Sequence, residues 1–434
     1  MMVDRGNVEL MMPSAYSSSA FNMPPSSPCL RVLVFTDTYF ETNGVGTFYR
    51  NMLSWCRDRP EYRLSVFCPQ RDDAVERDAP DNVHPIRGSI QFANPFYKDL
   101  VAGYFPLRRL RQRVAGIPGP KIIHIGTAGA MGATGSAIGR QLRLPQVGWY
   151  HTDLQAYGRL YGQGIFGRFG AKAGRVGAKF GEWASISCEK FSYSHCSAIN
   201  VASDSSVTTV RNFFSGPITI NPCPVDMERF QPAPTRDGEF RRRYNPDQRV
   251  LAIVVGRVAR EKNLDEVCAR MGNDPRIQLV FVGDGPYAQA LRRNWNARVT
   301  GFLHGDALLA AYQQADVLVQ LSTSETFGLS LVEALSCGLP AVVRRGPGFA
   351  SSVPPDRGVE VLEEADLPTL ADRCVSLVHD GPRHAAASRL VRELVRPIST
   401  DALFPKIMAF HAAYTELGTK WADALPARHE TAAA

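Results

Sequence analysis

Short β-branched runs alternate with stretches of helical spacing along most of the chain, and this alternation restricts its fold more than any other feature. The segments between the runs are long enough to hold crossover helices, the first of them predicted over about 46–55. Alternation of this kind predicts a parallel sheet with helices on both faces. In the first half of the chain, strands are predicted at 31–36, 63–67, 122–126, 146–150 and 198–202.

The alternation restarts after a break at 221–248, a segment with five prolines and many charges that is predicted to be an interdomain linker. Two such series predict an α/β protein with two Rossmann-like, doubly wound domains that face a cleft. Ligands of open α/β sheets bind outside the carboxyl ends of the strands, so functional residues are expected in the loops there. Beyond the break we predict strands at 251–256, 277–283, 297–302, 315–321 and 340–344, and helices at 263–271, 286–294, 305–314 and 328–337.

These patterns divide the 434 residues into an N-terminal domain at 29–220, the linker, and a C-terminal domain at 249–398. A last helix is predicted over 399–417, and we expect the segment 399–420 to cross back to the N-terminal domain. Residues 1–28 are rich in Ser and Pro and lack a continuous apolar run, so they are predicted to be a disordered tail rather than a signal peptide.

Composition excludes several classes of protein. The 49 Lys and Arg against 42 Asp and Glu give a net charge of +7, which permits anionic partners without requiring nucleic acid. The nine cysteines are widely spaced without a CxxC pair, which argues against a disulfide framework or a zinc site. No run of about 18 apolar residues occurs. We therefore expect a cytoplasmic protein, either soluble or peripheral on the inner face of a membrane.

The strongest chemical signal lies at 320–340, where a strand, a loop of small residues and a helix follow one another. Glu325 precedes the predicted helix, and Glu333 lies about two turns inside it. The amides of Phe327, Gly328 and Leu329 at the helix N-terminus suit a phosphate or a sugar oxygen. The alternative is that Glu325 only interacts with the helix dipole and Glu333 is a solvated helix residue.

A second signal is the sequence GRVAREKN at 256–263, directly after a predicted strand. Arg257 and Lys262 fall in this loop, and two cations there can neutralise a diphosphate. The alternative is an exposed basic loop paired with Glu261 and Asp265.

Two loops of the N-terminal half follow predicted strands. The segment 37–50 contains Asn43-Gly44-Val45-Gly46, a flexible backbone that a ligand could approach, or a plain strand-to-helix turn. His151 lies at the carboxyl end of another strand, a position that favours a functional over a structural histidine.

Other motifs are absent or out of place. No D-x-D pair occurs, so a carboxylate-held divalent metal is not indicated, and neither a P-loop nor a G-x-S-x-G occurs. A G-x-G-x-x-G at Gly162, Gly164 and Gly167 has no preceding strand and is rejected as a dinucleotide fingerprint.

Together these motifs resemble a retaining glycosyltransferase of the GT-B fold, similar to the large family 4 (RfaG-like, glycosyl transferases group 1). The resemblance covers about 31–417. Its most specific parts are the Glu325/Glu333 pair and GRVAREKN, and its supporting parts are NGV (43–45), YHTD (150–153), VDMERF (225–230) and VGDGP (282–286). One departure is CPVD (223–226), where relatives more often have Gly before Val-Asp; it puts the geometry of the interdomain hinge in doubt.

The resemblance implies a role for each candidate residue and no metal or other cofactor besides the nucleotide sugar. Arg257 and Lys262 would hold the donor diphosphate, Glu333 the ribose hydroxyls, and Glu325 the donor sugar. On the N-terminal side, Gly44 and Val45 would lie against the diphosphate, and His151 would stand near the anomeric centre. The amides of Thr326, Phe327, Gly328 and Leu329 would complete the sugar pocket.

The resemblance implies transfer of a hexose from a UDP- or GDP-sugar to a hydroxyl with retention. The acceptor side is indicated by two basic, aromatic segments, 97–114 and 159–181, which suit an anionic membrane surface beside a lipid or lipid-linked glycan, or form a solvated basic face. Two alternatives stay open: another GT-B-type enzyme, such as a nucleotide-sugar epimerase or a phosphorylase, or a non-enzymatic basic module that binds nucleic acid.

Overall fold

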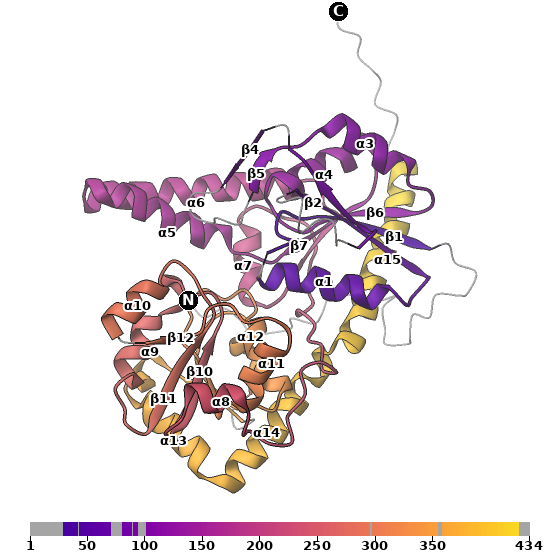
Figure 1. The fold of residues 1–434 in the computed structure, drawn as a ribbon. Helices are drawn as coiled ribbons and strands as arrows, with labels where there is room; N and C mark the ends of the chain where they lie inside the picture. The colour runs from indigo at the N-terminus through magenta and orange to yellow at the C-terminus, as the bar shows by residue number, and fades with distance from the viewer. Residues whose placement is uncertain are drawn as a thin grey trace, which may run out of the picture. The chain divides into compact units, whose positions relative to one another are not determined.

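The structure is a computed structural model that describes residues 29–41, 43–70, 80–88, 90–93, 101–295, 297–354 and 358–424. The predicted tail at 1–28 lies outside the described residues. The chain divides into two compact units (Figure 1). Unit 1 contains the described residues of Met1–Val201, Val207–Asn221 and Phe404–Ala434, and unit 2 those of Ala202–Ser206 and Pro222–Leu403.

The described residues of unit 1 form a seven-stranded parallel sheet in the order β3-β2-β1-β6-β7-β8-β9. A separate antiparallel pair consists of β4 and β5. All five residues of β7 are buried, as expected for a strand covered on both faces. The strands are β1 (Leu30–Phe35), β2 (Tyr62–Pro69), β3 (Val83–Ile86), β4 (Ile90–Ala93), β5 (Val101–Tyr104), β6 (Lys121–Ile125), β7 (Gln146–Tyr150), β8 (Ala198–Val201) and β9 (Ile218–Ile220).

Crossover helices connect these strands, and two longer helices, α5 and α6, form a hairpin that reaches away from the sheet of unit 1 (Figure 1). The last helix, α15, contributes Phe404 and later residues to unit 1. The helices are α1 (Gly44–Cys56), α3 (Leu107–Gly116), α4 (Ala130–Leu142), α5 (Leu154–Phe166), α6 (Ala171–Tyr193), α7 (Ser205–Arg211) and α15 (Thr400–Ala424).

The described residues of unit 2 form a six-stranded parallel sheet in the order β12-β11-β10-β13-β14-β15. Its strands are β10 (Val250–Val255), β11 (Ile277–Val282), β12 (Arg298–Val299), β13 (Val317–Gln320), β14 (Ala341–Arg344) and β15 (Val359–Leu362). Its helices are α8 (Glu239–Tyr244), α9 (Leu264–Met271), α10 (Ala288–Trp295), α11 (Gly305–Gln314), α12 (Leu329–Ser336), α13 (Leu370–His379) and α14 (Gly381–Val395).

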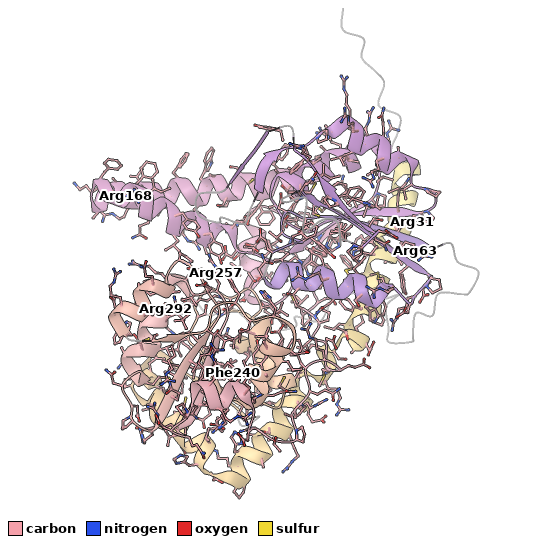
Figure 2. All side chains as sticks on the ribbon, in the orientation of Figure 1. Arg31, Arg63, Arg168, Phe240, Arg257 and Arg292 are labelled. Carbon is pink, nitrogen blue, oxygen red and sulfur yellow. The ribbon has the colours of Figure 1, made fainter. Side chains whose placement is uncertain are left out.

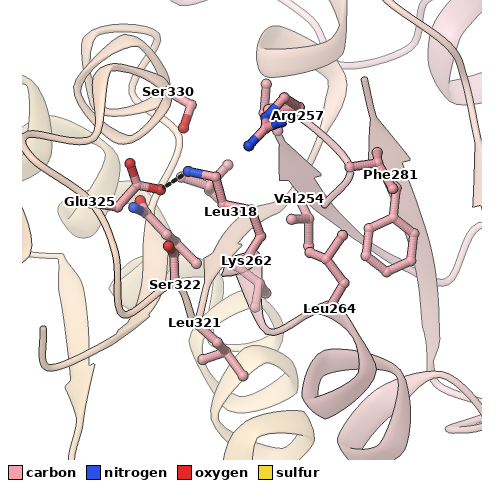
Figure 3. A pocket seen from close by; sticks show the side chains of 15 residues that line it. Val254, Arg257, Lys262, Leu264, Phe281, Leu318, Leu321, Ser322, Glu325 and Ser330 are labelled. Carbon is pink, nitrogen blue, oxygen red and sulfur yellow. Dashed lines mark hydrogen bonds and ion pairs between the residues drawn. The ribbon is translucent and has the colours of Figure 1, made fainter. Parts of the chain in front are cut away.

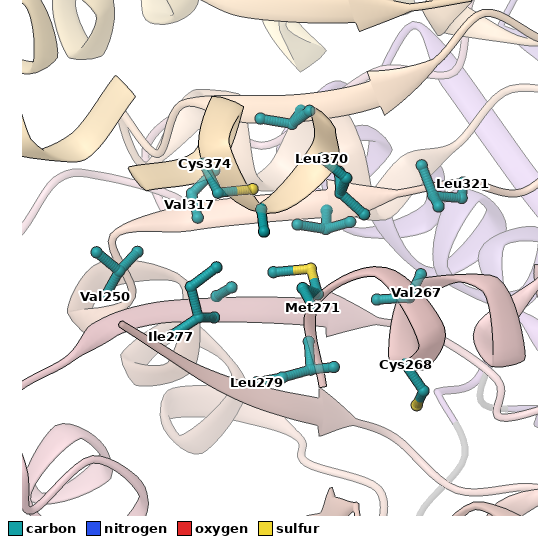
Figure 4. Packing of buried hydrophobic residues seen from close by; sticks show 14 of the residues in the cluster. Val250, Val267, Cys268, Met271, Ile277, Leu279, Val317, Leu321, Leu370 and Cys374 are labelled. Carbon is teal, nitrogen blue, oxygen red and sulfur yellow. The ribbon is translucent and has the colours of Figure 1, made fainter. Parts of the chain in front are cut away.

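The core of unit 2 lies between its sheet and the helices that cover it. Figure 4 shows Val267 and Met271 of α9 and Leu370 and Cys374 of α13 meeting strand side chains such as Val317. These residues are buried because α9 and α13 each present an apolar stripe to the sheet. The two parallel sheets confirm the predicted pair of Rossmann-like α/β folds.

The structure differs from two details of the prediction. Residues 222–248 are not a free linker: they belong to unit 2, where Arg236 and Arg241 form ion pairs with the buried Asp316, and part of the segment folds as α8. The strand predicted at 297–302 is reduced to β12, since Gly301 has a φ of 82° that ends the extended backbone.

Candidate functional site

The strand order of unit 2 reverses between β10 and β13, which are adjacent parallel strands. In a doubly wound sheet, the loops that leave two such strands part to opposite faces and leave a crevice at their carboxyl ends. A pocket lies there, and Figure 3 shows Arg257, Lys262 and Glu325 extending toward it, with Ser330 nearby. Three residues singled out from the sequence are thus brought to one place.

Both cations of this pocket have carboxylate partners. The Lys262 ammonium donates to Glu325 Oε1 at 2.5 Å, and the two side chains are only 22% and 16% exposed. Arg257 pairs with Glu261, four residues later. The alternative interpretation, an exposed basic loop, expected ion pairs with Glu261 and with Asp265. The pair with Glu261 is present, whereas Asp265 accepts hydrogen bonds from Tyr287 and Trp295.

The Arg257 loop is fixed by the glycine turn that follows β11. The amide of Val258 donates to the carbonyl of Asp284, and the Tyr287 amide donates back to the carbonyl of Val258. Gly283 has a φ of 146°, and a Cβ atom there would lie 2.0 Å from the carbonyl oxygen of Gly256. The VGDGP sequence is thus more than a turn, because its glycines admit the backbone that carries Arg257.

Helix α12 starts beside the same pocket. Its N-cap, Gly328, has a φ of 93° and no side chain to accept from the first-turn amides. The carbonyls of the two preceding residues are already hydrogen-bonded: that of Thr326 accepts from the Ser203 hydroxyl at 2.9 Å, and that of Phe327 from the Phe349 amide at 2.7 Å. A helix N-terminus arranged in this way suits an anionic ligand.

Glu333 lies half-buried on α12 rather than solvated. Its Oε2 accepts a hydrogen bond from the Tyr312 hydroxyl at 2.8 Å. Burial raises the pKa of Glu333 to about 7, while the Tyr312 hydrogen bond and the positive charge of Arg229 oppose this rise. Arg229 belongs to the VDMERF segment, whose turn is closed by Asp226 accepting from the amides of Glu228 and Arg229.

In unit 1 the loop after β1 leads into α1. Asn43 caps this helix by accepting from the Gly46 amide at 2.8 Å, with Gly44 exposed and Val45 buried in the first turn. The strand order reverses between β1 and β6, so this loop too lies at a topological switch point. Asp37 bridges it by accepting from the Thr127 hydroxyl and the Met131 amide.

His151 packs against the second turn of α1 and belongs to a buried hydrogen-bonded chain. Its Nε2 lies 3.1 Å from the Tyr49 hydroxyl, which lies 2.9 Å from His124 Nε2. His124 Nδ1 in turn lies 2.8 Å from His411 Nε2 on α15. His411 Nδ1 ends the chain 2.7 Å from the carbonyl oxygen of Ile407.

That terminal carbonyl fixes the direction of every hydrogen bond in the chain. A carbonyl only accepts, so His411 carries its proton on Nδ1. Burial lowers the pKa of His411 to about 4 and that of His151 to about 3, and it lowers the pKa of His124 too, so all three rings are neutral at pH 7. His124 therefore donates to His411, and Tyr49 donates to His124. His151 donates from Nε2–H to Tyr49, which leaves its Nδ1 unprotonated.

Several of these partners carry no local sequence signal. Tyr312, Ser203 and His411 lie 21, 123 and 260 residues from the groups they orient, and only the fold brings them together. Glu261 could have been identified from the sequence as a partner of Arg257, because it lies four residues after it. Asp37 could also have been identified from the sequence, because it is a carboxylate two residues after a strand.

Two further observations concern the described part of the chain. No group of three or more His, Cys, Asp or Glu side chains is placed to hold a metal ion there. The rejected G-x-G-x-x-G runs through α5 and the short 3-10 helix η1 (Gly167–Phe169), not through a strand-to-helix loop.

Two family models match the chain. Residues 42–229 match the model described as Glycosyltransferase Family 4, and residues 236–393 match Glycosyl transferases group 1. The break between the two matched segments falls close to the start of unit 2 at Pro222. The group 1 match spans all six strands of the unit 2 sheet, and the family 4 match spans the unit 1 sheet except for β1.

Curated relatives agree with this assignment. The chain is 29% identical to the sulfoquinovosyl transferase SQD2 of Arabidopsis thaliana, over 74% of this chain and 62% of that protein. It is also 29% identical to a GDP-mannose-dependent alpha-mannosyltransferase of Mycobacterium tuberculosis, over 62% of this chain and 68% of the relative. An alpha-monoglucosyldiacylglycerol synthase of Acholeplasma laidlawii is 26% identical over 54% of this chain and 60% of its own length.

Solved structures show the same fold at low sequence identity. HepE of Anabaena, determined with UDP and glucose, matches 89% of this chain and 100% of its own with a TM-score of 0.68 at 13% identity. WaaG, a glycosyltransferase involved in lipopolysaccharide biosynthesis, matches 88% of this chain and 98% of its own with a TM-score of 0.59 at 15% identity. The chain therefore belongs to glycosyltransferase family 4, the GT-B enzymes that transfer hexoses from nucleotide sugars.

Proposed function

We propose that this enzyme transfers a hexose from a UDP- or GDP-sugar to a hydroxyl of a membrane lipid or lipid-linked glycan, with retention of configuration. The observation that carries the donor half is the pocket at the switch point of unit 2, where Arg257, Lys262 and Glu325 meet. Breaking the sugar–phosphate bond places negative charge on the departing diphosphate. Fixed cations and helix amides stabilise that charge in a partly buried site.

Each residue of the donor site then has a role that its position supports. Arg257 and Lys262 bind the diphosphate, Glu325 contacts the sugar hydroxyls, and Glu333 accepts from the ribose hydroxyls. The amides of Thr326, Phe327, Gly328 and Leu329 bind oxygens of the donor. No metal ion is required, because the two cations and the α12 N-terminus supply positive charge for the leaving group.

The remaining roles belong to unit 1 and follow the resemblance to the family. Gly44 and Val45, at the start of α1, approach the diphosphate, and His151 stands near the anomeric centre. Retention without an enzymic carboxylate nucleophile implies attack from the face of the departing phosphate. The acceptor hydroxyl then loses its proton to a phosphate oxygen as the new glycosidic bond forms.

The acceptor class is supported by relatives that are named as lipid glycosyltransferases. One relative is a monoglucosyldiacylglycerol synthase, and another is a phosphatidylinositol monomannoside mannosyltransferase of Mycobacterium tuberculosis, 27% identical over 39% of this chain. No helix in the described part of the chain has the length and hydropathy needed to cross a bilayer. The lipid acceptors in the names of these relatives lead us to propose peripheral association with the inner face of a membrane.

The function is tested with the full chain, a set of UDP- and GDP-hexoses, and diacylglycerol or phosphatidylinositol in mixed micelles. We expect glycolipid formation from one donor, resistance to EDTA, and an anomeric coupling that matches the configuration of the donor. Inverted product or an EDTA-sensitive rate would contradict the proposal. Conversion of the donor without an acceptor would indicate an epimerase, and a rate that depends on inorganic phosphate would indicate a phosphorylase. Salt-dependent binding of DNA or RNA without sugar transfer would indicate the basic binding module.

The raised pKa of Glu333 predicts pH-dependent donor binding. An ionised carboxylate accepts from ribose hydroxyls more strongly than a neutral one, and Glu333 becomes protonated as the pH falls through about 7. We expect the donor KM to rise about tenfold between pH 8 and pH 6. Tyr312→Phe removes a hydrogen bond that lowers this pKa, so it moves the transition to higher pH. Glu333→Gln keeps a high KM at all pH values, and a wild-type KM independent of pH would exclude the assignment.

The directed hydrogen bonds behind His151 predict a loss of turnover in Tyr49→Phe. Without the hydroxyl, the Nε2–H of His151 loses the acceptor at 3.1 Å that favours this tautomer. We expect kcat to fall about 10- to 100-fold at unchanged donor KM, with a mixed-tautomer ¹⁵N signature for His151. Tyr193→Phe is the matched control, because it removes an equally buried hydroxyl that donates to the Trp149 carbonyl. Equal effects of the two variants would mean that these hydrogen-bonded side chains contribute only to packing.

A further inference from the structure

Helices α5 and α6 pack against each other through glycines. A Cβ atom at Gly162 would lie 2.0 Å from the carbonyl oxygen of Gly177, and one at Gly181 would lie 2.0 Å from that of Gly158. The two backbones are therefore in direct contact at these glycines, where little room is left for large side chains. The large side chains of the hairpin must point elsewhere.

Those side chains point to solvent. Among the described residues, eight of the ten large apolar side chains with high exposure lie on this hairpin. Phe169 at the turn is 81% exposed, and Val176, Phe180 and Trp183 on α6 are 67%, 57% and 62% exposed. Their spacing on α6 places them on one face, opposite Gly174, Gly177 and Gly181. A soluble monomer rarely exposes so many adjacent apolar side chains.

The same face carries positive charge. Arg168, Lys172, Arg175 and Lys179 are exposed, and no acidic residue occurs from Leu154 to Gly181. Figure 2 shows Arg168 at the far end of the hairpin. Arg159, nearer the base, is paired with Glu182 at 2.6 Å. The apolar and basic character is therefore concentrated toward the turn.

The base of the hairpin is rigidly anchored. Gln155 donates to Glu189 at 2.8 Å and accepts from Asn212, and Tyr193 donates to the carbonyl of Trp149. The far end lacks such anchors among the contacts of the described residues. The hairpin therefore has an anchored base and an exposed end with aromatic and basic side chains, as expected for an element that binds a partner through its tip.

The other basic segment, 97–114, is built differently in its described part, 101–114. Helix α3 turns Leu110 and Val114 into the core and exposes Arg108, Arg109 and Arg111. The first four residues of the basic segment, 97–100, lie outside the described residues. This helix is a solvated basic surface with its apolar side already covered, so the helix itself offers cations, and the exposed Tyr104 before it is the single large apolar side chain with high exposure among the described side chains of 101–114.

We propose that the tip of the α5–α6 hairpin, from Ile165 to Trp183, inserts its aromatic side chains into the interface of an anionic lipid bilayer. The inference deepens the proposed function, on which it rests, by naming the element that contacts the membrane. Phe and Trp partition into the boundary between headgroups and acyl chains, while Lys and Arg attract anionic headgroups. The absence of acidic residues from Leu154 to Gly181 favours a bilayer over a second copy of the same basic hairpin, which would repel it.

The test measures binding of the full chain to vesicles of phosphatidylcholine alone and of equal parts phosphatidylcholine and phosphatidylglycerol. We expect binding to the anionic vesicles only. Phe169→Ser/Phe180→Ser/Trp183→Ser is expected to weaken it at least about tenfold. Lys172→Gln/Arg175→Gln/Lys179→Gln is expected to weaken it about 100-fold, from about fivefold per cation near the surface. Quenching of Trp183 by brominated lipid, absent in Trp183→Phe, reports insertion directly.

Arg108→Gln/Arg109→Gln/Arg111→Gln is the matched control, expected to change binding by less than about threefold because α3 has no exposed apolar face. Loss of binding in this control with retention in both hairpin variants would overturn the proposal. So would a concentration-dependent dimer that the aromatic variant dissociates, with no vesicle binding by the wild type. All the substituted side chains are exposed, so circular dichroism of the variants should match the wild type.

Vesicle binding is measured without turnover, so its result is separate from the proposed function. If the hairpin proposal alone fails, the protein still forms glycolipid in detergent micelles but ignores anionic vesicles. If the proposed acceptor is wrong, the protein binds vesicles through the hairpin but transfers no sugar to lipid. Hairpin variants are expected to keep their kcat with lipid dispersed in detergent and to lose rate only on vesicles.

Discussion

Lys262→Ala is expected to lower turnover at least about 100-fold, the effect of removing one preorganised electrostatic contact from a transition state. In the structure Lys262 is paired with Glu325 beside Arg257. A donor diphosphate can bind this ammonium when Glu325 turns to the sugar hydroxyls. Without Lys262, the leaving group loses a cation and also faces an unpaired carboxylate. Measurement of kcat and donor KM for the purified variant gives the effect.

A double-mutant cycle separates these two contributions. Glu325→Gln is also expected to reduce turnover about 100-fold, because the carboxylate no longer orients the sugar. If Lys262 contacts the diphosphate directly, Lys262→Ala/Glu325→Gln is slower than either single variant. Arg260→Ala is the matched control: Arg260 lies on the same 3-10 turn, over the Tyr287 ring and outside the pocket lining, so near-normal kinetics are expected. Near-normal transfer by Lys262→Ala would remove the donor-site assignment.

Gly283→Ala is expected to destabilise unit 2 by more than about 3 kcal/mol. The new methyl group would lie 2.0 Å from the Gly256 carbonyl oxygen, in a backbone that cannot yield because it belongs to the Arg257 loop. The φ of 146° adds backbone strain of about 1–3 kcal/mol for any residue other than glycine. Urea unfolding measures the change in the free energy of unfolding.

Gly256→Ala is a close control for that clash. Gly256 has a similar φ of 138°, but a Cβ atom there meets nothing within 4 Å. It should therefore show the cost of strain without the cost of the clash. Equal stability losses in the two variants would mean that the contact between the two glycine turns is not needed to hold the Arg257 loop.

Most of the fold follows from local patterns in the sequence. The runs at 251–256 and 277–283 became β10 and β11 within a residue or two, since β-branched and apolar runs in these lengths fit only a strand buried on both faces. The Pro-rich segment misled the prediction because proline and charge mark both free linkers and segments that lie along a surface. The ion pairs of Arg236 and Arg241 with Asp316 show that this segment lies along unit 2. Each pair joins residues 75 to 80 positions apart, which no local pattern reveals.

The candidate site divides in the same way. The types and order of Arg257, Lys262, Glu325 and Glu333 can be read from the sequence, and the positions of the first three after strands predict that they meet. The Tyr312 hydroxyl on Glu333 and the Ser203 hydroxyl on Thr326 have no motif, because each is an ordinary residue of its own element.

By itself, the sequence determined the two parallel sheets, the strand-end loops that carry the proposed donor-binding residues, and the glycines that these loops require. It did so because hydrophobic periodicity, charge and backbone conformation are properties of short segments. Only the tertiary structure decided that Lys262 pairs with Glu325, that three histidines and Tyr49 form one directed chain, and that α5 and α6 face solvent with their aromatic side chains. Such contacts join residues far apart in the chain, and the distances between them are set by packing rather than by any local pattern.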